Sequence, residues 1–90
     1  MIIKPSTRKD KRFMAIFDDK NKVHFGLKDG DTYIDHQDKK KRENYIKRHQ
    51  VNEDWSNPYS AGALSRYLLW GKSTDLNTNI NKFKSMYNIK

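Results

Sequence analysis

Two stretches near the start of the chain consist largely of apolar, β-forming residues and predict β-strands. Residues 12–17 and residues 22–27 are rich in aromatic and β-branched side chains, and the polar residues 18–21 separate them. Two such runs joined by a short polar connection are typical of a β-hairpin, so we expect the strands to pair antiparallel. After a further turn, residues 32–35 predict a short third strand.

The pattern then changes to helical spacing. Asp38 has the side chain of a helix N-cap, and the helix is expected to run to about Gln50. Successive residues of a helix are about 100° apart, which places five side chains on one side. These are Asp38, Arg42, Tyr45, Ile46 and His49. We expect this side to face the protein and the opposite side to face solvent.

Two more helices are predicted in the second half of the chain. Ser60 caps a helix over residues 61–70, and Gly71 stops it in the position after the last turn. Ser73 or Thr74 caps the last helix. This helix has an apolar stripe at spacings of four, three and four residues, which is typical of an amphipathic helix on a core. The stripe consists of Leu76, Ile80, Phe83 and Tyr87.

These elements predict an α+β fold with a two- or three-stranded antiparallel sheet packed against two or three helices. Residues 12–90 are expected to form a single domain, preceded by a basic N-terminal arm over residues 1–11. The predicted core draws on aromatic side chains, because aliphatic ones are few. It consists of Phe13, Ala15, Phe17, Val23, Phe25, Tyr45, Ile46, Trp55, Leu64, Leu68, Trp70, Ile80 and Phe83.

The composition narrows the class of partner. The chain has 90 residues and a net charge of +8, which suits a phosphate backbone, an anionic surface or an acidic protein. It has no cysteine, so disulfides and thiolate zinc sites are excluded. No apolar stretch approaches the length of about 18 residues that a membrane-spanning helix needs, and no signal peptide is recognisable. We therefore expect no membrane partner.

The strongest functional signal is a basic run on the first predicted long helix. Residues 39–49 contain six Lys or Arg and one acid, Glu43. Such a cluster can neutralise phosphates and release their counterions, although a solvated charged face is the simpler explanation. Lysines near the N-terminus form a second group, and Arg66 and Lys72 add further charge. The predicted nucleic-acid-binding residues are Lys9, Lys11, Lys39, Lys40, Lys41, Lys47 and Arg48.

Not every basic residue of this helix is expected to bind a partner. Arg42 and His49 share the inward side with Tyr45. We expect them to be held by nearby acids in a structural polar cluster, whose members are Asp35, Asp38, Arg42, His49 and Glu53. The outward lysines would then be the phosphate-binding residues.

Aromatic side chains offer a second way to bind nucleic acid, by stacking on unpaired bases. The candidates are Tyr33, Trp55, Tyr59, Tyr67 and Trp70. A chain with few aliphatic residues needs its aromatic rings for packing, so we expect at least four of the five in the core or at its edge.

Enzymatic chemistry has weak support. A small metal-dependent hydrolase would need His36, Asp38, His49 and Glu53 to converge, but their spacing matches no common ligand motif. The four glycines are scattered, so no phosphate-binding loop is present. We therefore predict no enzymatic activity, no catalytic or metal-binding residues and no cofactor.

Several segments, taken in order and spacing, resemble a family of small uncharacterised proteins from nucleocytoplasmic large DNA viruses, including phycodnavirus-like and mimivirus-like groups. The segments are Lys11-Arg12-Phe13-Met14-Ala15-Ile16-Phe17, Lys22-Val23-His24-Phe25-Gly26, Tyr33-Ile34-Asp35-His36-x-Asp38, Arg42-x-x-Tyr45-x-x-Arg48-His49, Glu53-x-Trp55-x-x-Pro58 and Ala61-Gly62-Ala63-Leu64-Ser65-Arg66-x-x-Leu69-Trp70. The resemblance covers about residues 11–72. It implies a viral origin, a location in the host cytoplasm or virion and a compact single domain, and it implies no catalytic residues.

The expected function is that of a small basic viral protein that binds nucleic acid with low sequence specificity. DNA is the nucleic acid that we expect first. The alternative is a minor virion, structural or protein-interaction component whose basic face meets an acidic partner. The sequence leaves DNA versus RNA and the oligomeric state open.

Overall fold

The computed structural model describes residues 1–90 and has an α+β fold, as the sequence predicts. Three antiparallel strands form one sheet in the order β1-β2-β3. They are β1 (Ile2–Pro5), β2 (Lys11–Ile16) and β3 (Lys22–Leu27). The helices are α1 (Tyr33–His36), α2 (Lys39–His49), α3 (Ala61–Leu64) and α4 (Leu76–Tyr87), with a π-helical segment, η1 (Ser65–Leu69), directly after α3.

The predicted hairpin forms β2 and β3. Phe13 pairs with Phe25 and Ala15 with Val23, so these side chains share the inner face of the sheet. The turn at residues 18–21 closes with a hydrogen bond from the backbone N–H of Phe17 to the carbonyl of Asn21, at 3.0 Å. The inner face of the hairpin therefore supplies one wall of the core.

The first strand corrects the prediction for the N-terminus. Residues 2–5 were expected to belong to a basic arm, but they pair with β2, and Ile3 lies opposite Ala15. The burial of side chains alternates along this strand as it does in a sheet with one covered face, because Ile3 is half-buried while its neighbours Ile2 and Lys4 are exposed. The side chain of Met1 is also buried in the core.

The third strand predicted for residues 32–35 is wrong, since these residues belong to α1 and its N-cap. The carboxylate of Asp35 accepts hydrogen bonds from the backbone N–H and the hydroxyl of Thr32, at 2.9 and 2.7 Å. This is a capping box with Asp in place of the usual Glu, and it favours a helical turn over an extended strand. α1 therefore leads the chain from the sheet to α2.

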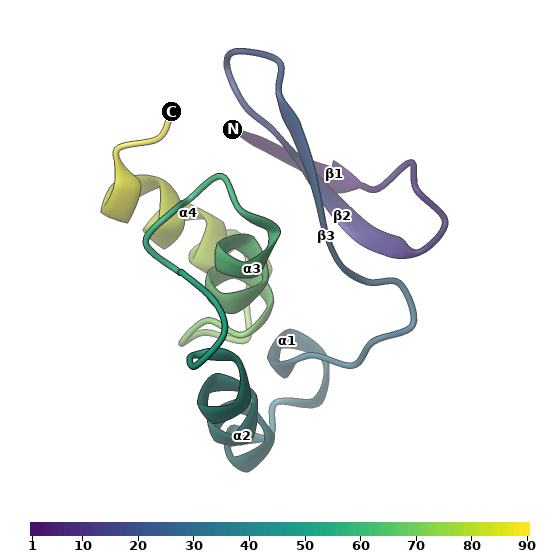
Figure 1. Ribbon diagram of the computed structural model, residues 1–90, viewed down its shortest axis with the longest axis vertical. Coiled ribbons are helices and arrows are strands. Elements are labelled where there is room, and N and C mark those ends of the chain that lie inside the picture. Colours follow the sequence, from purple (N-terminus) through teal and green to yellow (C-terminus); the bar gives the residue numbers. More distant parts are fainter.

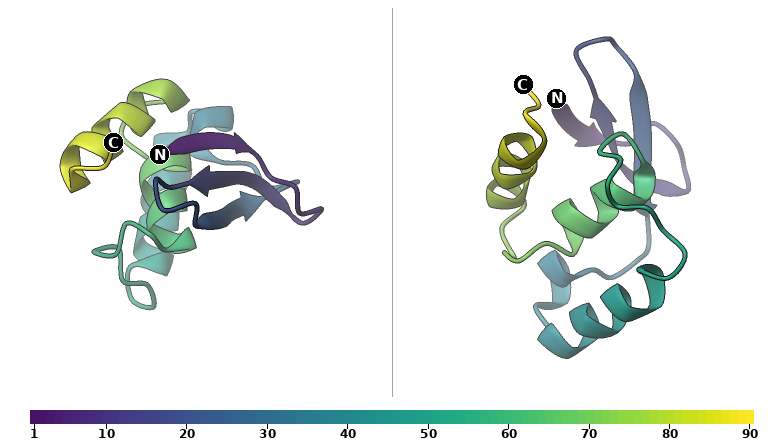
Figure 2. Two further views of the ribbon diagram at one scale, coloured as in Figure 1. Left: turned by 90° about the horizontal axis from the view of Figure 1, so that it is seen from above. Right: turned by 60° about the vertical axis from the view of Figure 1, so that its left-hand side comes forward.

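The segment of α3 and η1 lies between the sheet and α4 (Figures 1 and 2). Ser60 caps α3 as predicted, and its hydroxyl accepts from the backbone N–H of Ala63 at 3.1 Å. The helix then widens, because the N–H of Trp70 bonds to the carbonyl of Ser65, five residues earlier, at 3.0 Å. Gly26 allows β3 to approach this segment, since a Cβ on Gly26 would lie 2.8 Å from the side chain of Leu69.

The end of this segment and the start of α4 differ in detail from the prediction. Gly71 follows the last turn, but its backbone is not left-handed. A Cβ there would collide with the carbonyl of Tyr67 and lie 2.8 Å from Asn79, so close packing explains the glycine. The N-cap of α4 is Asp75, which accepts from the N–H of Thr78 at 3.2 Å, and neither Ser73 nor Thr74 takes this role.

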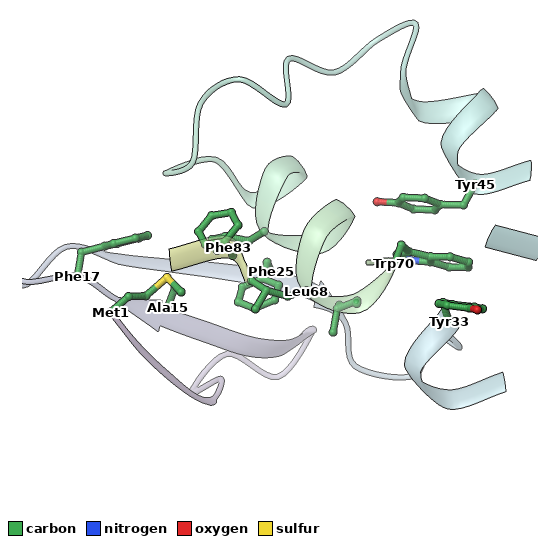
Figure 3. Close-up of a cluster of buried hydrophobic side chains, with 11 residues drawn as sticks. Met1, Ala15, Phe17, Phe25, Tyr33, Tyr45, Leu68, Trp70 and Phe83 are labelled. Carbon is green, nitrogen blue, oxygen red and sulfur yellow. The ribbon is translucent and has the colours of Figure 1, made fainter. Parts of the chain in front are cut away.

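The core largely agrees with the prediction. Twelve of the thirteen predicted core residues belong to the main cluster or pack against it, whereas Trp55 is half-buried outside it. The sequence did not predict three further members of the main cluster, Met1, Tyr33 and Leu69. Figure 3 shows this cluster extending from Phe17 and Met1 at one end to a stack of aromatic rings at the other.

Candidate nucleic-acid interface

Helix α2 forms because Asp38 caps it and its two sides have opposite character. The Asp38 carboxylate accepts from the backbone N–H groups of Lys40 and Lys41, at 2.9 and 3.3 Å. Tyr45 is buried, and three other residues of the same side are half-buried. These are Arg42, Ile46 and His49. The predicted inward side of the helix is therefore confirmed.

An aromatic stack fixes α2 against the end of η1. The ring of Tyr45 lies parallel to that of Trp70, with centroids 4.2 Å apart and an interplanar angle of 3°. Figure 3 shows Trp70 between Tyr45 and Tyr33. His49 stacks on the other face of Tyr45 at 4.2 Å. Burial raises the pKa of Tyr45 to about 12, so the phenol is neutral at physiological pH.

Arg42 is held in place, but by different partners from those predicted. Its Nε donates to the carbonyl oxygens of Trp70 and Gly71, at 3.1 and 3.0 Å. Nη1 of Arg66 donates to the same Trp70 carbonyl at 2.9 Å. Two guanidinium groups thus satisfy the carbonyls left free where η1 ends, and they lie at the negative end of its dipole. Acidic side chains are not the partners of Arg42.

The other members of the predicted polar cluster form separate pairs. Asp35 binds Arg12 of β2 through two hydrogen bonds of 2.6 and 2.7 Å. The Arg12 guanidinium holds the pKa of Asp35 well below its ordinary value. His49 and Glu53 form an i,i+4 pair with Nδ1 and Oε2 3.3 Å apart, as predicted. The five residues therefore do not form one cluster.

The outward side of α2 carries cations without acidic partners. Five of the seven predicted phosphate-binding residues lie on this helix and are exposed. They are Lys39, Lys40, Lys41, Lys47 and Arg48. None forms an ion pair within 4.0 Å. The single acid of the helix, Glu43, is exposed and forms no such pair either.

The first turn of α2 has an unfavourable charge distribution. It contains three lysines and no acid. The N-terminus of a helix is the positive end of its dipole, where each cation costs about 0.3–1 kcal/mol when exposed. Asp38 offsets part of this cost as the N-cap. The stability of the helix therefore does not explain why lysines occupy its first turn.

Two cavities lie beside α2 and share Asp31, Arg48 and Trp70. The larger, of about 600 Å³, is lined on α2 by Lys41, Asn44, Lys47 and Arg48. It has three cations against one carboxylate, so it is suited to an anion. The other, of about 420 Å³, has Lys11 and Arg48 against Asp31 and Glu53 and is balanced in charge.

The N-terminal basic residues lie apart from the lysines of α2, although Lys11 shares the balanced cavity with Arg48. Lys11 begins β2 and is half-buried at the balanced cavity. Lys9 is exposed in the loop between β1 and β2. Neither lines the larger cavity. The seven predicted residues are thus divided between the helix and the sheet.

His36 also lines the larger cavity. Its Nδ1 accepts from the backbone N–H of Asp38 at 2.8 Å, so the ring proton belongs on Nε2. Nε2 is buried without a hydrogen-bond partner. The ring lies edge-on to Trp70 with centroids 5.3 Å apart. His36 therefore joins α1 to the aromatic stack.

Residues 1–49 match a family described as a family of unknown function, DUF5754. The chain belongs to the DUF5754 family. The matching residues run from β1 to the end of α2 and include all seven predicted phosphate-binding residues. No curated protein and no solved structure matches the chain. Membership of this family therefore gives no information about the activity of the protein.

In this DUF5754 chain the five aromatic stacking candidates are mostly packed, as expected. Tyr33 and Trp70 are buried, and Trp55 and Tyr67 are half-buried. Tyr59 is 55% exposed, and its ring packs edge-on to Phe17 with centroids 4.7 Å apart. Tyr33 and Trp70 belong to the main cluster and Tyr67 packs against it, while Tyr59 contacts its edge at Phe17 and Trp55 lies outside it.

The residues of the hydrolase alternative do not converge. His36 bonds to the backbone of Asp38, Asp38 caps α2, and His49 pairs with Glu53. No three His, Asp or Glu side chains are arranged to hold a metal ion. None of the helices is long and apolar enough to span a membrane.

Arg12 and Arg66 hold this region together in ways that the sequence did not predict. Arg12 joins β2 to α1 through Asp35, and Arg66 joins η1 to the loop at Trp55, whose ring lies 5.2 Å from its guanidinium carbon. The spacing of Thr32 and Asp35 was a usable signal for the first, because it matches a capping box. The position of Arg66 depends on the π-helical turn, which no sequence pattern indicated.

Proposed function

We propose that this protein binds nucleic acid with low sequence specificity through α2 and has no enzymatic activity. The observation that carries the proposal is the row of exposed cations on α2 that have no acidic partner. Three of them oppose the helix dipole, so they weaken the helix that carries them. An external polyanion would offset that cost by releasing counterions and supplying the missing negative charge.

The larger cavity beside α2 supports contact with phosphates. Lys41, Lys47 and Arg48 line it together, and one carboxylate, Asp31, opposes them. A phosphate oxygen there would accept charge-assisted hydrogen bonds, which are about twice as strong as neutral ones. The lysines of the first turn, Lys39 and Lys40, would extend the contact along the backbone of the nucleic acid.

Low sequence specificity follows from the residue types. Lysine is a flexible point charge and carries no geometric preference for one base. The opposite side of α2 is committed to the aromatic stack and to Arg42. The helix therefore offers phosphate contacts and few groups for reading base edges.

We also propose a viral origin, with a location in the host cytoplasm or the virion. The support is the sequence resemblance described above. A virus with a large DNA genome has a use for a small basic protein that covers phosphates.

Direct binding to duplex DNA tests the proposal. Fluorescence anisotropy at low salt should give saturable binding, and the variant Lys39→Ala/Lys40→Ala/Lys47→Ala should bind at least about tenfold more weakly. A dissociation constant above about 10⁻⁴ M at low salt for the unmodified chain would refute the proposal, because ordinary non-specific binders do better.

A pull-down with and without nuclease separates nucleic acid from an acidic protein as the partner. Under this proposal, partners recovered from an infected-cell lysate are lost after nuclease treatment. Retention of an acidic protein after nuclease, together with weak DNA binding, would favour the alternative of a structural or protein-interaction component.

A further inference from the structure

A second basic cavity lies between η1 and α4, on elements other than α2. Its volume is about 360 Å³. Arg66, Lys72 and Lys82 line it, and no acid does. None of these three cations forms an ion pair within 4.0 Å. The cavity thus concentrates positive charge that the protein itself does not neutralise.

The remaining surface of this cavity is mostly apolar. Phe83 is buried, Tyr67 is half-buried, and Met86 is 55% exposed although it is a large hydrophobic residue. Tyr67 and Phe83 bring two aromatic rings, with centroids 6.2 Å apart. A ligand that fits this cavity therefore needs an apolar, preferably flat, part as well as an anionic group.

The one uncharged amide at the cavity is already occupied by the protein. Nδ2 of Asn79 donates to the carbonyls of Leu68 and Ser73, at 3.0 and 2.8 Å. Its Oδ1 accepts from the backbone N–H of Ser73 at 3.2 Å. Asn79 therefore shapes the cavity, while recognition of a polar ligand is left to the cations.

Arg66 is the fixed cation of the three. Its Nη1 is bound to the Trp70 carbonyl, and its guanidinium carbon lies 5.2 and 5.1 Å from the ring centroids of Trp55 and Tyr67. Its Nε is buried without a partner. Because the guanidinium is bonded to a carbonyl and packs against two rings, its position is fixed, whereas Lys72 and Lys82 are exposed and able to adjust.

We propose that this cavity binds one nucleotide, with the phosphate at Lys72 and Lys82 beside Arg66 and the base on the surface of Tyr67 and Met86, over the buried ring of Phe83. The volume lies within the range of about 300–1,000 Å³ that small-molecule sites occupy. A nucleotide combines the anion and the flat ring that the lining calls for. The source is either a free nucleotide or an unpaired nucleotide in a single strand. This site does not depend on the role proposed for α2.

Titration of the isotope-labelled full chain with adenosine 5′-monophosphate, followed by amide chemical shifts, tests the site. Saturable shifts are expected around Lys72, Lys82 and Met86. The variant Lys72→Ala/Lys82→Ala should bind about tenfold more weakly, because two charge-assisted contacts are lost. The matched control Lys22→Ala/Lys28→Ala removes the same charge from the sheet and the turn after it and should change Kd by less than about twofold.

Further probes separate the parts of the ligand. Inorganic phosphate and adenosine should each bind more weakly than adenosine monophosphate. The variant Met86→Ala should weaken binding of the monophosphate but leave binding of inorganic phosphate unchanged. Displacement of the monophosphate by single-stranded oligo(dA) supports a strand as the source, and saturable binding without displacement supports the free nucleotide.

Three results would overturn the site. The first is absence of saturation by the monophosphate. The second is an equal loss in the Lys22→Ala/Lys28→Ala control, which would indicate diffuse electrostatics. The third is equal affinity for inorganic phosphate and the monophosphate, which would indicate an anion site that does not recognise a base.

Discussion

Arginine residues in this protein differ in what they contact, and the difference separates structure from candidate function. Arg42 and Arg66 bind backbone carbonyls where η1 ends, and Arg12 binds Asp35. Arg48 is exposed and unpaired on α2. At the scale of single residues, stability and nucleic-acid binding should therefore respond to different substitutions.

Arg42→Ala should destabilise the fold by about 1–3 kcal/mol, because it removes hydrogen bonds from a charged donor to two carbonyls. Duplex DNA binding should change little. Urea unfolding measures the first quantity and anisotropy the second. Arg48→Ala is the matched control on the same helix, with an expected loss of stability within about 0.5 kcal/mol and weaker DNA binding. A stable Arg42→Ala protein that no longer binds DNA would contradict this assignment.

The Arg12–Asp35 pair should make stability depend on pH in the acid range. The folded state lowers the pKa of Asp35, so the pair stabilises the protein above the unfolded-state pKa of about 3.9 and loses its effect as the pH falls below that value. Asp35→Asn should therefore reduce the stability of the protein at neutral pH, and it should reduce it much less at about pH 2. Urea unfolding at the two pH values measures this difference.

Asp10→Asn is the control for that experiment, since Asp10 pairs with Arg8 in an exposed loop at 3.3 Å. Exposed pairs contribute little, so this variant should match the unmodified protein at both pH values. An equal loss of stability in Asp35→Asn at the two pH values would show that the ion pair is not responsible.

Helical phase predicted which residues of α2 turn inward, but not what they touch. Arg42 and His49 share a side with Tyr45, and both are half-buried. Glu53 was predictable as the partner of His49, because it lies one turn beyond it. The partners of Arg42 are carbonyls 28 and 29 residues away, and tertiary packing alone brings them together.

At the scale of elements, the sequence prediction failed at three places, and local interactions explain two of them. Residues 32–35 include Tyr and Ile, which favour strands, yet the Thr32–Asp35 capping box made them helical. The N-terminal residues form β1 because β2 offers a free edge and Ile3 fits the core. The π-helical turn of η1 had no sequence signal, although it sets the direction of Trp70 and Arg66.

Asn79 ties three elements together, so its loss should be costly. Asn79→Ala would leave the carbonyls of Leu68 and Ser73 and the N–H of Ser73 without their partner in a buried site, which should lower stability by about 2–3 kcal/mol. Chemical denaturation measures the loss. Asn81→Ala, on the exposed side of α4, should change stability by less than about 0.5 kcal/mol. Equal effects of the two substitutions would refute this role.

At the scale of the whole molecule, charge is distributed unevenly over a fold that the sequence largely predicted. Sheet and helices pack around an aromatic core, and the net charge of +8 is concentrated partly on α2 and partly at the cavity between η1 and α4. Composition revealed the excess charge. It did not reveal the second cavity, because Arg66, Lys72 and Lys82 meet only through the packing of α4 on η1.

The salt dependence of duplex DNA binding tests the role of α2 most directly. Each neutralised phosphate contributes about −0.9 to the slope of log K against log salt concentration. Lys39→Ala/Lys40→Ala/Lys47→Ala should make that slope shallower by about 2.7. Lys4→Ala/Lys22→Ala/Lys28→Ala removes three exposed charges from the sheet and the turn after it, and should leave the slope nearly unchanged. Equal slopes for the two variants would contradict binding through α2.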